Sequence, residues 1–197
     1  MTRTNIVDIL NKHDGSMTHS QLMTRLRGFG IGNINKILEN LVKEGSIKIS
    51  GNTIIAIPIH RADQILRSGN ENEDGSIEQT GHNQVSIPYN NTLFKVVNES
   101  GELLDEITID EGMVDLLKAI WRHEILTTKS CEGGNGETAF ICFQWHRDVD
   151  RFNSLIGHIS RISGKKEWIF VEKSLEISFP PEHIAMMTKE LDSKPID

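Results

Sequence analysis

A polar stretch in the middle of the chain constrains the fold more than any other feature. The eighteen residues "RSGNENEDGSIEQTGHNQ" (67–84) contain a single apolar side chain, Ile77. Such a segment cannot bury enough apolar surface to offset the entropy that it loses on ordering. We therefore expect a linker over residues 61–90, with a short helix near its start at 62–66. It would join an N-terminal domain, residues 1–60, to a C-terminal domain, residues 91–197.

Charge is divided unevenly between the two parts. Residues 1–60 hold seven Lys/Arg and four acidic residues, a net charge of +3, whereas the rest of the chain holds 14 and 24, a net charge of −10. Only the basic part attracts a polyanion, so the asymmetry favours two domains with different partners.

The remaining composition is typical of an intracellular protein. The chain of 197 residues has two cysteines, too few for a disulfide framework. It has no apolar window of the ~18 residues that a membrane span needs, and its first residues lack the apolar core of a signal peptide. We expect a cytoplasmic location and no membrane contact.

The first sixty residues predict three helices followed by a hairpin. Thr18 and Gln21 have the spacing of a capping box, which would open the second helix. Gly45 is the expected stop of the third helix, and Gly51-Asn52 is a plausible two-residue hairpin turn. Apolar residues at helical spacing mark the first and third helices: Ile6, Ile9 and Leu10, then Ile31, Ile34, Ile37, Leu38, Leu41 and Val42.

These features together resemble a winged helix-turn-helix domain over residues 3–58. The matching stretch is "MTHSQLMTRLRGFGIGNINKILENLVKEGSIKISGNTIIAI" (17–57), with a capped helix, a glycine turn, an apolar-striped helix and "KEGSIKI" leading into a wing. The resemblance implies a compact fold whose third helix enters a nucleic-acid groove.

The polar residues around this third helix suit nucleic-acid contact. Asparagine pairs with adenine, lysine contacts guanine or phosphate, and arginines before the turn would meet the backbone. The candidate residues are Arg25, Arg27, Asn33, Asn35, Lys36, Asn40, Lys43 and Lys48. Two other interpretations stay open: a merely solvated helix face, and a protein-docking surface, because the wing tip Gly51-Asn52 carries no Arg or Lys.

After residue 90 the pattern changes to ββ-α-ββ-α-ββ-α. It predicts an α+β sandwich in which helices cover a mainly antiparallel sheet. The first of its helices would be capped by Asp110 and would bury an apolar stripe: Met113, Leu116, Leu117, Ile120 and Trp121.

Residues 109–143 resemble small bacterial and phage domains in which an acidic residue precedes a helix and the next strand ends in a Ser-Cys-x-Gly loop. The resemblance implies no particular activity. The matching residues are Asp110, Glu111, Trp121, Thr127, Ser130, Cys131 and Gly133.

The loop after Cys131 has several chemical interpretations. A nucleophilic cysteine needs a cation or a base nearby, and the adjacent Glu132 disfavours a thiolate. A zinc site would combine His123, Cys131, Cys142 and His146, but no paired C-x2-C is present. The glycines fit a turn between two strands, and exposed N–H groups there could hold an anion. The candidate ligand loop is Cys131, Gly133, Gly134 and Asn135.

The sequence therefore predicts a two-domain regulator. Its winged helix would bind DNA, and its acidic α+β domain would sense, dimerise or recruit. The alternative is a phage or mobile-element protein that docks on a host or defence complex. We expect no enzymatic activity, cofactor or metal; a protein partner and a homodimer are further expectations about its assembly.

Overall fold

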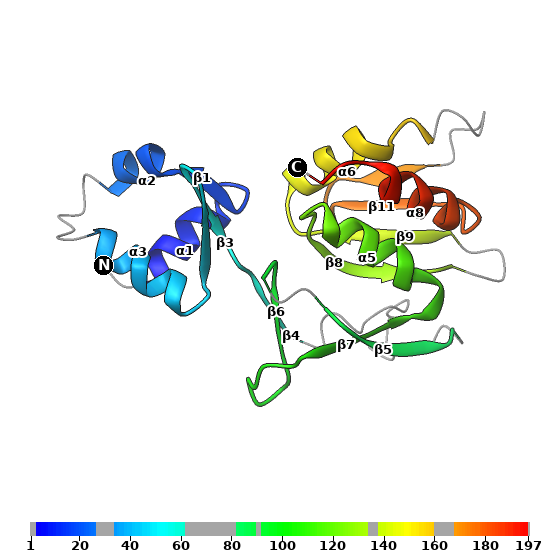
Figure 1. Cartoon of the computed structure of the whole chain (residues 1–197), viewed down its shortest axis with the longest axis horizontal. Helices are drawn as coiled ribbons and strands as arrows, with labels where there is room; N and C mark the ends of the chain where they lie inside the picture. Colours follow the sequence, from blue (N-terminus) through cyan, green and yellow to red (C-terminus); the bar gives the residue numbers. More distant parts are fainter. Residues whose placement is uncertain are drawn as a thin grey trace. The chain divides into compact units, whose positions relative to one another are not determined.

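The computed structural model describes residues 3–26, 34–61, 82–89, 92–133, 138–159 and 168–196. The chain divides into two compact units, Met1–Ile59 and His60–Asp197 (Figure 1). Both units combine helices with antiparallel strand pairs, so the expected α+β class is confirmed. Within the described residues, no helix has the length and apolar character needed to cross a membrane.

Unit 1 has three helices and one small sheet. Its elements are α1 (Arg3–Asn11), β1 (Ser16–Thr18), α2 (His19–Leu26), α3 (Ile34–Lys43), β2 (Ile47–Ser50) and β3 (Thr53–Ala56). The strands form an antiparallel sheet in the order β1-β3-β2. The β2–β3 hairpin turns at Gly51-Asn52 as expected, with Gly51 at φ +56°. The three-residue strand β1 was not expected.

The helix ends of unit 1 follow their sequence signals. The Thr18 N–H donates to Gln21 Oε1 at 2.8 Å, and the Gln21 N–H donates to Thr18 Oγ1 at 3.2 Å, which is the predicted capping box. At the end of α3, Gly45 takes φ +65°. The N–H groups of Gly45 and Ser46 donate to the carbonyls of Val42 and Leu41, the Schellman pattern that ends a helix.

The second unit is built from more, shorter elements. They are β4 (Ile59–Arg61), β5 (Gln84–Pro88), β6 (Lys95–Val97), β7 (Glu106–Asp110), the 3-10 turn η2 (Glu111–Met113), α5 (Val114–Arg122), β8 (Thr127–Cys131), β9 (Ala139–Phe143), α6 (His146–Ile156), β10 (Ile169–Val171), β11 (Glu176–Phe179) and α8 (His183–Ser193). A four-stranded sheet has the order β10-β11-β9-β8, and two further pairs are β4-β6 and β5-β7.

The structure corrects the expected linker at both ends. His60 and Arg61 already belong to β4, and Gln84–Pro88 form β5, which pairs antiparallel with β7. Ile87 of β5 is buried opposite Ile107. A short strand whose partner lies about twenty residues away gives little local signal. Residues 62–81, including the helix expected at 62–66, lie outside the described residues.

Helices α5, α6 and α8 lie together against the four-stranded sheet (Figure 1). A chain of aromatic contacts runs through this core: Phe143 contacts Phe152 at 5.0 Å between ring centroids, and Trp168 lies between Phe152 and Phe179 at 6.2 and 5.8 Å. Rings of this size supply much of the apolar area that a domain of this length can bury.

Candidate nucleic-acid interface and the loop of the second unit

Helix α3 has one buried face and one exposed polar face. Ile34, Leu38 and Leu41 are buried. The exposed residues are Asn35, Lys36, Glu39, Asn40, Val42 and Lys43. At about 100° per residue, Lys36, Asn40 and Lys43 fall within a stripe roughly 60° wide that points away from the buried face. The structure thus brings three of the predicted contact residues together on one surface.

The other predicted contact residues lie off this stripe. Asn35 is exposed about 100° around the helix from Lys36. Arg25 is exposed in the last turn of α2, and Lys48 is half-buried on β2. Arg27 and Asn33 lie outside the described residues.

Sequence reasoning missed Glu39 as a member of this face. The signal was present, because Glu39 stands three residues after Lys36 and four before Lys43, and helical neighbours have these spacings. Its side chain is exposed. The face therefore mixes two cations, one amide and one carboxylate.

In unit 2 the cysteine loop connects two paired strands. Cys131 ends β8 and lies opposite Phe140 of β9. Its side chain is buried, and Gly133 takes φ +67°, a conformation that favours glycine. This geometry is that of the turn interpretation. Gly134 and Asn135 lie outside the described residues.

The four residues considered for zinc lie in different surroundings. The Nε2 atom of His123 lies 2.8 Å from the Leu191 carbonyl oxygen, and His146 is exposed at the start of α6. Burial, with the neighbouring Glu176 carboxylate, raises the pKa of the Cys142 thiol to about 12. In the part of the chain that the structure describes, no three His, Cys, Asp or Glu side chains gather as metal ligands.

A polar cluster that the sequence did not predict surrounds Glu132. Its Oε2 accepts a hydrogen bond from the Gly112 N–H at 2.5 Å, and its Oε1 lies 3.0 Å from His82 Nδ1. Its own N–H donates to Asp110 Oδ2 at 3.2 Å. The expected helix cap is therefore wrong. The Asp110 side chain makes no capping hydrogen bond at η2, and its carboxylate instead accepts a hydrogen bond from the Glu132 N–H in the loop. The cluster thus joins the residues just before α5 to the end of β8.

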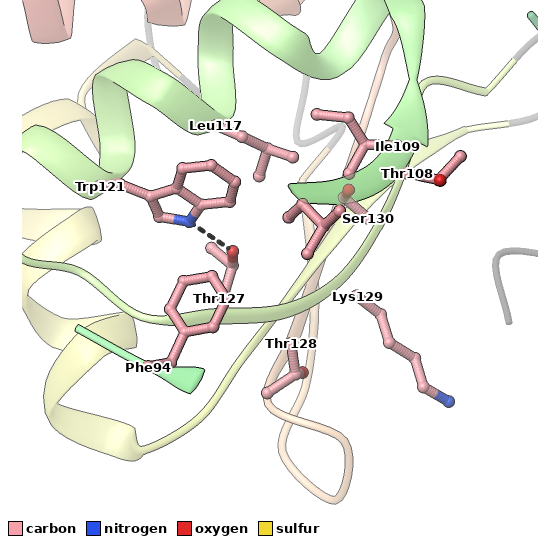
Figure 2. A pocket seen from close by; sticks show the side chains of 10 residues that line it. Phe94, Thr108, Ile109, Leu117, Trp121, Thr127, Thr128, Lys129 and Ser130 are labelled. Atoms are coloured by element: carbon pink, nitrogen blue, oxygen red, sulfur yellow. Dashed lines mark hydrogen bonds between the residues drawn. The ribbon is translucent and has the colours of Figure 1, made fainter. Parts of the chain in front are cut away.

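A small hollow lies between β7 and β8, and side chains of α5 line it as well (Figure 2). Phe94, Leu117 and Trp121 form its apolar wall, and the Trp121 Nε1–H donates to Thr127 Oγ1 at 2.9 Å. Lys129 lines the rim and extends away from the other side chains in Figure 2. The volume of about 20 Å³ fits one water molecule. Neither Cys131 nor Gly133 lines the hollow.

Comparison of the chain with protein-family models, with curated proteins and with solved structures finds no match.

Proposed function

We propose that unit 1 is a winged helix-turn-helix domain that binds duplex DNA through α3, and that the protein is a DNA-binding regulator. The element order α1-β1-α2-α3-β2-β3, with its three-stranded sheet, supports the proposal. The observation that carries it is the exposed stripe of Lys36, Asn40 and Lys43.

The dimensions of the stripe suit a major groove. An α-helix with its side chains is about 10–12 Å across, and Lys36 and Lys43 lie about 10 Å apart along its axis. The major groove of B-DNA is about 12 Å wide and admits a helix. Lysines at the two ends of such a stripe would reach phosphates or guanine, and Asn40 between them would reach adenine.

The acidic second unit would not contribute to DNA affinity. Residues after 60 carry a net charge of −10, which repels a polyanion. We assign to this unit a sensing, dimerisation or recruitment role.

A second candidate function is protein docking, and a specific observation favours it. Val42 on α3 and Ile49 on β2 are 42% and 48% exposed, and apolar side chains at such positions fit a protein partner better than a phosphate backbone. Under this alternative the chain is a phage or mobile-element protein that binds a host or defence complex.

Affinity for duplex DNA as a function of salt separates the two functions. Groove binding through lysines releases counterions, so affinity falls steeply as salt rises. Docking through Val42 and Ile49 predicts no affinity for DNA at low salt, and capture of a protein partner that Val42→Asp abolishes.

A further inference from the structure

We infer that Glu39 is a specificity-determining residue, which favours DNA sites where the base that its carboxylate reaches in the major groove is cytosine or adenine, whose amino groups donate, over guanine or thymine. The inference rests on the proposed DNA binding by α3 and deepens it. It concerns the one acidic side chain on the exposed face of this helix.

The burial pattern places Glu39 beside the outermost line of the helix. The buried residues Ile34, Leu38 and Leu41 define the inward direction. Lys36 and Lys43 then lie within about 15° of the opposite direction, and Glu39 and Asn40 lie about 50° to either side. Along the axis, both stand between the two lysines. A helix inserted into a groove by its lysines would thus present Glu39 and Asn40 to the base edges.

The chemistry of a carboxylate decides what Glu39 accepts there. An ionised carboxylate only accepts hydrogen bonds. The major-groove donors are the amino groups of cytosine and adenine, whereas the O6 and N7 atoms of guanine and the O4 atom of thymine are acceptors. A carboxylate that faces the acceptor atoms of guanine or thymine, near the phosphates, loses its hydration and gains no hydrogen bond in return. Glu39 therefore lowers affinity for sites with guanine or thymine at the base that it faces and spares sites with cytosine or adenine there, a form of selection by repulsion.

A structural role for Glu39 predicts a different result. The order Glu39 to Lys43 is the favourable one for a helical pair at spacing i to i+4. If that pair were its whole role, changing Glu39 would alter helix stability slightly and leave sequence preference untouched.

The test is selection of bound duplexes from a randomised pool by the full chain, with Glu39→Gln as the variant. Asp8→Asn is the matched control, since Asp8 is an exposed acid on α1 and the charge change is the same. We expect the natural chain to enrich a motif with one cytosine or adenine position that Glu39→Gln relaxes or shifts toward adenine, because glutamine pairs with adenine. Discrimination at that position should fall about tenfold or more, while total affinity for unrelated DNA rises.

Three results count against the inference, and they are distinguishable. An unchanged motif with Glu39→Gln removes the role of Glu39 and leaves the proposed function standing. Failure of the natural chain to enrich or bind any duplex at low salt removes the proposed function, and the inference with it. Glu39→Ala, checked for its fold by circular dichroism, gives an independent second variant. A loss of selectivity at several positions at once would instead indicate a distorted helix and would also count against the inference.

Discussion

The Glu132 carboxylate accepts a hydrogen bond from the backbone N–H of Gly112, with 2.5 Å between Oε2 and N, although the two residues are twenty positions apart. The same carboxylate contacts His82, which precedes β5. One side chain therefore connects the end of β8 to the middle of η2 and to the segment leading into β5. We interpret this cluster as a structural latch of unit 2.

Loss of the latch should destabilise unit 2. Glu132→Ala removes the acceptor of the Gly112 N–H, and we expect a decrease of about 1–2 kcal/mol in the free energy of unfolding. Urea titration followed by far-UV circular dichroism measures it. Glu172→Ala, at an exposed turn residue, is the control and should change stability by less than about 0.5 kcal/mol.

A double-mutant cycle shows whether the contact itself is responsible. A Cβ at position 112 would collide with Glu132 Oε2, so Gly112→Ala must displace the carboxylate. The two substitutions should therefore be less than additive, with the Gly112→Ala cost falling once Glu132 is alanine. Fully additive costs would mean that the two residues act independently.

Cys142 should make the protein less stable at alkaline pH. Its thiol pKa is raised from 9.0 to about 12 by burial and by the Glu176 carboxylate. The unfolded chain ionises first, so this contribution is fully present below pH 9 and is lost as pH rises from 9 toward 12. Urea midpoints between pH 8 and 10.5 should fall less in Cys142→Ala than in the natural chain. Parallel pH profiles for the two proteins would contradict the assignment.

His60 should make the protein less stable at acidic pH. Burial lowers its pKa, its ring contacts Phe94 at 5.7 Å, and its Nε2 atom is buried without a hydrogen-bond partner in the described structure. The unfolded chain takes up the proton first, so the contribution is present above pH 6.5 and is lost as pH falls through the lowered folded-state pKa. His60→Leu should flatten the stability profile between pH 7 and 5. An equally steep profile in that variant would assign the acid sensitivity to other groups.

The sequence predicted best what depends on neighbours in the chain. The Thr18–Gln21 box, the Gly45 stop and the Gly51-Asn52 turn each involve residues within a few positions of one another, and all are present. Strand β5 and the Glu132 latch were missed because their partners, β7 and Gly112, are about twenty residues away. The prediction for Asp110 was wrong for the same reason. Its position before η2 predicts a helix cap, but its carboxylate accepts a hydrogen bond from the N–H of Glu132, which is distant in the sequence.

The candidate interface was predictable in part. The identity of the polar residues came from the sequence, but their grouping depends on which side of α3 is buried. Burial of Ile34, Leu38 and Leu41 separates Lys36, Asn40 and Lys43 from Asn35, and it adds Glu39. A pattern of apolar residues predicts a helix more readily than it predicts the direction of each polar side chain.

The central claim is that α3 binds duplex DNA, and a salt-dependent binding titration tests it most directly. Anisotropy of a labelled duplex would be measured with the full chain between about 50 and 200 mM salt. We predict affinity that falls steeply with salt, and a slope of log K against log salt that decreases by about 1 in Lys43→Ala. Lys12→Ala, which removes an exposed lysine from the turn just after α1, should keep the natural slope. No binding at the lowest salt, or equal effects of the two lysine variants, would contradict the account.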